Sequence, residues 1–443
     1  KNLGPIESGE IDFNDLKGIN LIIGKNNTGK TYLSNLLYTY FKVRERQNIK
    51  MDEVVGIRFK DRLSDSDYET IKDYFEKKYE KEIKDTLPQV FHTSKDTFKD
   101  FEIEVNLSDE ILEFKKLDDD TIIYFREMRK TIKLKKFEDK IEYLMEDYDE
   151  NKGKRYTTYK AKIQEEDAKQ FIFGYFLHIK FFQKIYKFYS FPAERSGAVL
   201  FYKQLLEERS DVLRELELGN SENIGKISRY SEPVNDYVKF LNSISDRSKG
   251  LTELDIYKKL DTELKEILGG EVIIDLEGNI MFRMNEKKII DIGMVSSTVK
   301  TLTGFYLYLK YFAMERDIIF IDEIELNLHP ENQRKIMKLI NYLSKQGIKF
   351  IISTHSPIIT EEIDNMLLFE KVKNKINSEE MKEYGINSEY GLKTSDINVF
   401  HLHNKTVEKI KEKNGEFEIE TFNTVLEETD NLYQTLLFYA EEK

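Results

Sequence analysis

The sequence of 443 residues contains no cysteine and no tryptophan, and it has only six prolines. Because cysteine is absent, disulfide bonds and thiolate metal sites are excluded, which fits a reducing compartment. No apolar run approaches the roughly 18 residues of a membrane span, and we expect no basic-then-apolar signal segment. Scarce proline and glycine predict no flexible linker between domains. We therefore expect a cytoplasmic protein without a membrane segment, whose subdomains are joined directly and not by linkers.

The composition favours a folded protein with an acidic surface. Hydrophobic residues make up 40% and aromatic residues 12% of the chain, which excludes disorder as a whole because such a chain can bury a large core. The 69 basic residues against 82 acidic ones leave a net charge of −13. This balance does not favour a general nucleic-acid surface, although a local basic patch stays open.

Residues 24–31, Gly-Lys-Asn-Asn-Thr-Gly-Lys-Thr, match the pattern G-x-x-x-x-G-K-[ST] in full. The pattern follows a short β-branched run at 19–23 and precedes helical spacing over 30–46, which is the context that it requires. Glycines let backbone N–H groups turn toward phosphate, Lys30 reaches the terminal phosphates, and Thr31 offers a hydroxyl to Mg²⁺. The predicted nucleotide ligands are Gly24, Asn26, Asn27, Thr28, Gly29, Lys30 and Thr31.

Two further apolar runs end in residues that suit phosphate chemistry. The run 318–321 ends in Asp322 and Glu323, and the run 350–353 is followed by Thr354 and His355. Ligands bind at the carboxyl ends of parallel strands, so these side chains should meet there. Asp322 can hold the Mg²⁺ shell, and Glu323 can orient or deprotonate a water that attacks the γ-phosphate. We expect His355 to hydrogen-bond the γ-phosphate or that water.

The segment between these motifs has a different character. Phe101–Val105, Thr121–Phe125 and Thr131–Leu134 predict strands of a meander, whereas 138–148 and 165–189 predict helices. Strand–helix alternation at both ends of the chain, with this excursion between them, predicts a discontinuous α/β domain.

Asp322 stands 292 residues after Lys30, so an insertion splits the phosphate-binding part of the chain. We expect five segments: a first part of the α/β head at 1–46, a β-meander and helical insertion at 47–190, a helical lobe at 191–268, a second part of the head at 269–370, and a C-terminal closing element at 371–443.

These motifs together resemble the ABC-type ATPase heads of the SMC, RecF and OLD group, and more specifically the stand-alone ATP-binding AAA family ATPases of prokaryotic anti-phage and toxin–antitoxin-like operons. The resembling stretches are 4–6, 11–13, 21–31, 322–330 and 353–357. The resemblance implies an α/β fold, a P-loop ABC-type ATPase head with a central mostly parallel sheet, an antiparallel β-meander and a large helical insertion. It also implies Mg²⁺-dependent hydrolysis of ATP, with Glu323 and His355 as catalytic residues.

The same resemblance implies a head-to-tail homodimer. Its signature segment would carry Ser296, which would touch the γ-phosphate of the ATP bound by the partner. Thr298 stands where the family favours glycine, and Ile324 replaces the usual proline. For the Q-loop glutamine, Gln89 is the better candidate and Gln47 the poorer one.

Several residues leave alternatives open. Arg195 either reaches the nucleotide or the signature region, or Glu194 or Arg195 joins a buried ion pair with the core. His401 and His403 share one face of a predicted strand but have no third metal ligand nearby. A basic run at 126–136 is interpreted as a solvated face rather than a nucleic-acid surface. Residues 371–443 lack the Asp-x-Asp pair that an OLD-type nuclease module needs.

The hypothesis that follows is an ATP-hydrolysing switch, the sensor or regulator of a bacterial anti-phage defence system. It would control a separate effector from the same operon, a toxin or a nuclease, with a phage protein as trigger. One alternative is a RecF/SMC-like DNA clamp, which the net charge does not favour. The other is an OLD-like nuclease with an unrecognised active site.

Overall fold

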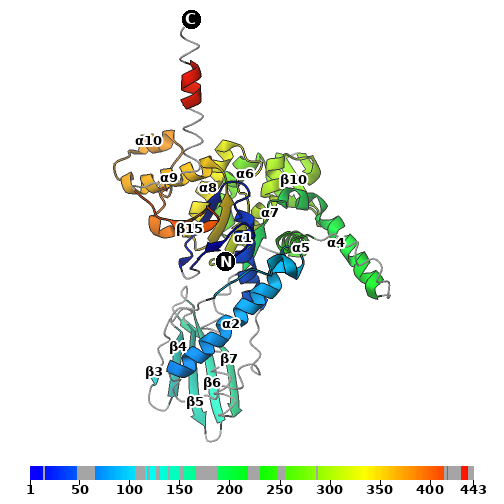
Figure 1. Ribbon diagram of the computed structural model, residues 1–443, viewed down its shortest axis with the longest axis vertical. Helices are drawn as coiled ribbons and strands as arrows, with labels where there is room; N and C mark the ends of the chain where they lie inside the picture. Colours follow the sequence, from blue (N-terminus) through cyan, green and yellow to red (C-terminus); the bar gives the residue numbers. More distant parts are fainter. Residues whose placement is uncertain are drawn as a thin grey trace. The chain divides into compact units, whose positions relative to one another are not determined.

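The structure is a computed structural model (Figure 1). It describes residues 1–12, 15–46, 65–105, 115–116, 120–125, 130–137, 140–149, 154–164, 187–217, 230–247, 255–285, 288–413, 417 and 431–437. The chain forms two compact units. The first comprises Lys1–Phe41, Lys84–Ile103 and Tyr186–Lys443, and the second comprises Lys42–Ile83 and Glu104–Ile185. Among the described helices, none combines the length and apolar character needed to cross a bilayer.

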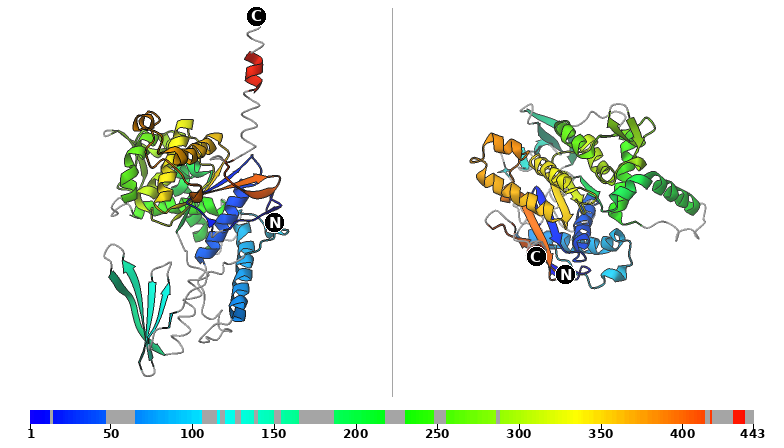
Figure 2. Two further views of the ribbon diagram at one scale, coloured as in Figure 1. Left: turned by 90° about the vertical axis from the view of Figure 1, so that its left-hand side faces the viewer. Right: turned by 90° about the horizontal axis from the view of Figure 1, so that it is seen from above.

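The first unit is built on a seven-stranded sheet. Its strands, in spatial order, are β1 (Ser8–Gly9), β15 (Thr406–Ile410), β14 (Ile397–His403), β2 (Ile19–Gly24), β13 (Lys349–Thr354), β12 (Ile318–Ile321) and β8 (Phe188–Phe191). The strands from β14 to β8 all run parallel, and β15 pairs antiparallel with β14. In Figure 2 the blue strand β2 lies beside the orange strand β14, although they come from opposite ends of the chain. The predicted mostly parallel central sheet is confirmed.

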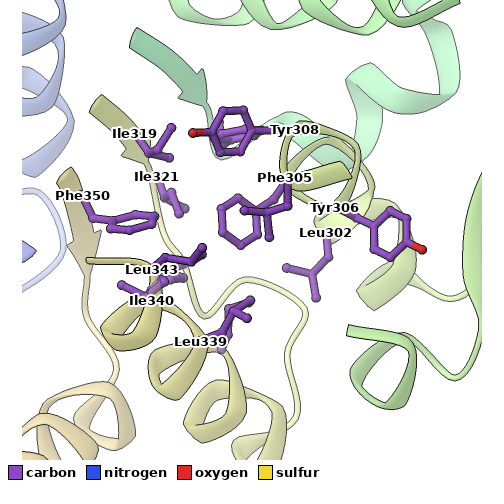
Figure 3. Packing of buried hydrophobic residues seen from close by; sticks show 14 of the residues in the cluster. Leu302, Phe305, Tyr306, Tyr308, Ile319, Ile321, Leu339, Ile340, Leu343 and Phe350 are labelled. Carbon is purple, nitrogen blue, oxygen red and sulfur yellow. The ribbon is translucent and has the colours of Figure 1, made fainter. Parts of the chain in front are cut away.

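The central strands are buried on both faces, which explains their continuous apolar runs. Every residue of β2 and β12 is buried. On one face the core packs against α7 (Ser297–Tyr311), α8 (Pro330–Lys345) and α9 (Pro357–Val372). Figure 3 shows Phe305 of α7 among residues of β12, β13 and α8. Each such side chain stabilises the fold by about 1.5–3 kcal/mol.

Other elements of the first unit extend from this core. Two helices, α1 (Lys30–Arg46) and α2 (Asp65–Val90), have residues in both units. The other helices are α4 (Arg195–Glu217), α5 (Glu232–Arg247), α6 (Asp255–Leu268) and α10 (Ser378–Glu383). Short 3₁₀ helices are η3 (Lys95–Phe98), η5 (Ile292–Met294) and η6 (Thr394–Asp396). A three-stranded antiparallel sheet contains β9 (Glu271–Ile274), β10 (Ile280–Asn285) and β11 (Lys288–Asp291). Residues 431–437 are helical, and each of them is exposed.

The second unit contains a five-stranded antiparallel meander, which confirms the predicted antiparallel sheet. Its strands are β3 (Lys115–Lys116), β4 (Asp120–Phe125), β5 (Lys130–Phe137), β6 (Lys140–Asp149) and β7 (Lys154–Gln164). The helix predicted at 138–148 is wrong, because β6 pairs along its length with both β5 and β7. This two-sided pairing overrides the helix propensity of its Glu, Leu and Met residues.

One more sequence prediction is corrected, and another is corrected only at its last residues. Phe101–Val105 forms no strand; Phe101 is buried with its ring 6.4 Å from that of Phe98, and the N–H of Glu102 donates a hydrogen bond to the carbonyl of Lys1 at 3.0 Å. These isolated contacts hold the segment in place of the hydrogen-bond ladder of a strand. The predicted helix at 165–189 lies outside the described residues up to 186, and its last two residues belong to β8.

Candidate functional site

The three predicted motifs lie on neighbouring strands at one edge of the sheet. β13 pairs with β2 on one side, where Thr354 is in register with Ile23, and with β12 on the other, where Ile352 is in register with Ile321. Asp322 therefore follows β12 at the level where β2 and β13 also end. Stretches that are 292 residues apart in the sequence are thus two strands apart in space.

Residues 24–31, which we call the P-loop, lead from β2 into α1. The ammonium group of Lys30 donates hydrogen bonds to the carbonyl oxygens of Gly24 at 2.8 Å and Lys25 at 2.9 Å. Lys30 is only 8% exposed, and this burial lowers its pKa. The negative charges of Glu323, Glu325 and Asp322 oppose that shift, since they favour the charged ammonium. The cation is therefore held at the loop within the field of the carboxylates.

Gly29 is needed for the shape of the P-loop. Its φ of +105° is costly for a residue with a side chain, and an added Cβ would come within 2.8 Å of Ile6 and 2.9 Å of Pro5. Asn27 also has a positive φ, 63°, which asparagine tolerates better than most residues. The hydroxyl of Thr28 donates to the carbonyl of Lys25 at 2.8 Å, so it braces the turn from inside. Such a loop can direct its backbone N–H groups at an anion.

Ser353, at the end of β13, orients both acidic residues after β12. Its hydroxyl donates a hydrogen bond to the carboxylate of Asp322 and accepts one from the backbone N–H of Glu323 at 2.9 Å. Burial raises the pKa of Asp322, while the bond from Ser353 and the charge of Arg195 act in the opposite direction. Glu323 has a φ of +49°, which turns the chain sharply away from the strand.

Arg195 holds the backbone of this turn. It is 2% exposed, and its guanidinium donates to the carbonyl oxygens of Pro192 at 3.0 Å, Asp322 at 2.6 Å and Glu323 at 2.8 Å. Burial lowers the pKa of Arg195, and the neighbouring carboxylates counteract this effect. The sequence left open a nucleotide contact or a buried ion pair. The hydrogen-bond partners of the buried guanidinium are instead backbone carbonyls.

His355 is anchored by Glu325, a residue whose role the sequence did not indicate. Glu325 is buried, and its carboxylate accepts hydrogen bonds from the hydroxyl of Thr354 at 2.8 Å and the backbone N–H of His355 at 2.7 Å. Nδ1 of His355 also lies 3.0 Å from Oε1 of Glu325, and the imidazole is 41% exposed. The only signal for Glu325 was its place two residues after Glu323.

Ser296 lies at the exposed start of α7, where its hydroxyl accepts a hydrogen bond from the N–H of Val299 at 3.4 Å. The unusual Thr298 has a structural partner, because its hydroxyl donates to the carbonyl of Asn327 at 2.7 Å. The Asn327 side chain in turn donates to the hydroxyl of Thr301 at 3.0 Å. The start of α7 is thereby fastened to the segment that follows Glu323.

The remaining candidates do not join this cluster. Gln89 lies in the last turn of α2, exposed, and its amide donates to the carbonyl of Asp85 at 3.4 Å. Gln47 and residues 126–129 of the basic run lie outside the described residues. The rings of His401 and His403 stack with centroids 5.4 Å apart. In the part of the chain that is described, no group of three or more acidic, His or Cys side chains is placed to hold a metal.

The parallel sheet, the glycine-containing loop and the acidic strand end define a P-loop nucleotide-binding fold. A family model described as AAA ATPase domain matches residues 1–360, and the chain belongs to this family. Solved structures similar to the chain include the SMC head domain from Thermotoga maritima, with 10% identity over 91% of this chain and 92% of that chain and a TM-score of 0.28. Another is the Smc head domain with an extended coiled coil bound to the C-terminal domain of ScpA, from Pyrococcus furiosus, with 12% identity over 95% and 94% and a TM-score of 0.28.

Proposed function

We propose that this protein binds ATP together with Mg²⁺ and hydrolyses the bond between its β- and γ-phosphates. The observation that carries the proposal is the convergence of Lys30, Asp322 and Glu323 at one sheet edge, where a single hydroxyl, that of Ser353, orients both acidic residues. A buried lysine with carboxylates nearby suits a site that receives both a polyanion and a divalent cation. Family membership agrees with this chemistry.

The P-loop residues fit a triphosphate. Lys30 would exchange its bonds to the carbonyls of Gly24 and Lys25 for phosphate oxygens, while the backbone of Asn26, Asn27 and Gly29 would cradle the β-phosphate. Lys30 is already fixed at the loop, so little side-chain freedom remains to be lost on binding.

The metal would take oxygen ligands from this chain. The hydroxyl of Thr31, at the exposed start of α1, and the carboxylate of Asp322 are the hard donors that Mg²⁺ prefers. When bound, the ion neutralises charge on the phosphates.

Glu323 and His355 would act on the attacking water. Glu323, held by Ser353 and Arg195 at its backbone, would orient the water or accept its proton. The half-exposed imidazole of His355 would hydrogen-bond the γ-phosphate or that water, with Glu325 fixing its backbone. Each residue would thus act from a backbone position that a neighbouring side chain holds.

We further propose an ABC-type, head-to-tail homodimer. Ser296 is exposed at the start of α7, so it is free to contact an ATP bound to the partner. Two ATP molecules would then be enclosed at one isologous interface, and hydrolysis would open it. The biological role that we propose is a switch in an anti-phage defence system that controls a separate toxin or nuclease effector in response to a phage protein.

A turnover assay tests the activity. Purified protein should release phosphate from ATP with Mg²⁺ and release none with EDTA. K30A should weaken ATP binding about 10- to 100-fold, because it removes charge-assisted hydrogen bonds worth about 1.5–3 kcal/mol. Mg²⁺-dependent turnover that is equal in K30A and the wild type would contradict the assignment of the site.

Adding plasmid DNA to the same assay separates the biological roles. Turnover without cleavage and without a DNA effect supports a switch. Salt-sensitive stimulation of turnover by DNA would instead favour a clamp, and cleavage of the plasmid would favour a nuclease.

A further inference from the structure

A cavity of about 60 Å³ lies beside the proposed metal ligands. Its lining includes Thr31 and Asn35 of α1, Ser190 of β8, Asp322 after β12, and Glu194. One ordered water needs roughly 10–15 Å³ of such space and two to four polar partners. The cavity is therefore large and polar enough to hold water next to Thr31 and Asp322.

The fold places Glu194 at this cavity for a specific reason. β8 is the parallel neighbour of β12, with Phe191 in register with Ile321, and the N–H of Asp322 donates to the carbonyl of Phe191 at 3.0 Å. The turn that follows β8 therefore lies next to Asp322.

The backbone of Glu194 is itself held. Its carbonyl accepts hydrogen bonds from the N–H groups of Gly197 and Ala198, both at 3.0 Å, at the start of α4. Arg195 binds the carbonyls of both Pro192 and Asp322, so it ties the turn to the acidic strand end. The backbone of Glu194 is thus fixed beside the cavity, while its side chain is exposed and borders the same cavity as Thr31 and Asp322.

We propose that Glu194 helps to hold the divalent cation of the bound nucleotide, through a water in this cavity. The inference rests on the proposed function and adds a residue to it. Mg²⁺ usually keeps several of its waters and binds only one or two carboxylates. With Asp322 and Thr31 as its protein ligands, the ion would therefore keep water at other coordination positions, and these waters would need hydrogen-bond acceptors from the protein. A carboxylate that accepts hydrogen bonds from such waters holds them in place and so supports binding of the ion. Glu194 is accordingly a positioning residue rather than a catalytic one.

The test uses Mn²⁺ in place of Mg²⁺ and a non-hydrolysable ATP analogue, with bound Mn²⁺ measured by electron paramagnetic resonance. E194A should weaken the Mn²⁺ affinity of the protein–nucleotide complex about 10- to 100-fold, the usual effect of losing an outer-shell partner. E194Q, which keeps an oxygen acceptor, should fall between E194A and the wild type. Nucleotide affinity measured in EDTA should stay the same in all of them.

The matched control is E207Q, which removes one negative charge from an exposed position on α4, the helix that follows Glu194, outside the cavity. It should leave the Mn²⁺ affinity unchanged. If the wild type binds the nucleotide with Mn²⁺ and E194A keeps the same Mn²⁺ affinity, this inference is overturned while the proposed function stands. If the wild type binds no nucleotide, the proposed function fails and this inference fails with it.

Discussion

The guanidinium of Arg195 donates a 2.8 Å hydrogen bond to the backbone carbonyl of Glu323. Glu323 has a φ of +49°, a conformation that costs a non-glycine residue on the order of 1–3 kcal/mol. Such a turn persists only where its surroundings hold it, and Arg195, which also binds the carbonyl of Asp322, is one such restraint. The two residues are 128 positions apart in the sequence.

Replacing Arg195 with methionine should therefore destabilise the turn. R195M removes the guanidinium donor from three carbonyl groups, and the carbonyl of Asp322 then has no other donor among the described residues, whereas Pro192 and Glu323 each keep a backbone N–H. It also removes the cation that opposes the raised pKa of Asp322. We expect the free energy of unfolding to fall by about 1–3 kcal/mol in denaturant titrations, and ATP turnover to fall as well. R195K cannot reproduce the forked geometry and should rescue only part of the loss. Wild-type stability in R195M would show that the turn needs no such restraint.

E323Q should separate ATP binding from hydrolysis. The amide keeps the shape of the side chain but cannot accept a proton, so turnover should fall about 10²- to 10⁴-fold. ATP should still bind, and size-exclusion chromatography with ATP should show a persistent dimer, because hydrolysis no longer opens it. K30A is the comparison. An equal loss of ATP affinity in both variants would contradict the separate roles of Lys30 and Glu323.

S296A tests the contribution of α7 to the partner's site. We expect turnover to fall about 10- to 100-fold with little change in the ATP affinity of the monomer, because the hydroxyl would act only in the closed dimer. The helix cap that Ser296 provides is long, at 3.4 Å, so its loss should cost at most about 1 kcal/mol. S297A, at the neighbouring exposed position, is the matched control. If S296A and S297A turn over ATP equally well, the proposed dimer contact is not made by Ser296.

Asp317, just before β12, should make stability depend on pH. It is buried, accepts hydrogen bonds from the Tyr308 hydroxyl at 2.8 Å and the Met314 N–H at 3.0 Å, and burial raises its pKa to about 6. Because the folded state holds this proton more tightly than the unfolded state, the stabilisation is complete below about pH 4. It is lost as the pH rises through 6, by about 3 kcal/mol.

D317N removes this titration. Relative to the wild type, the variant should gain about 3 kcal/mol in unfolding free energy between pH 4 and pH 7.5. Denaturant titrations at both pH values measure the difference, and D100N, at an exposed position, reports the effect of removing a charge elsewhere. A constant difference between D317N and the wild type across this range would show that Asp317 does not titrate there.

The sequence predicted the parallel core because β2, β12 and β13 are short runs buried along almost their whole length, and such runs carry a strong pattern. It could not predict β6, whose residues favour a helix until two neighbouring strands pair with them. Whether strand or helix wins there depends on contacts with β5 and β7, and these appear in no local window of the sequence.

In the site, the residues with a fixed spacing pattern were the ones that could be named in advance. Lys30, Asp322 and His355 each follow an apolar run, and the structure brings their strand ends together. The roles of Arg195 and Glu325 were harder to predict, because they depend on which residues lie beside them in the fold. A buried arginine that binds backbone carbonyls looks like any other arginine in the sequence, and the hydrogen bond that Thr354 donates to Glu325 spans 29 residues.

The position of β2 within the sheet has a consequence for biosynthesis. The strand that leads into the P-loop is enclosed by β13 on one side and β14 on the other, and β14 ends only at His403. A ribosome must therefore polymerise the chain through His403 before β2 gains its last neighbour. Such distant pairing folds slowly and leaves strand edges open meanwhile. During translation, a nascent chain shorter than this would carry its P-loop on a strand with one edge still unpaired.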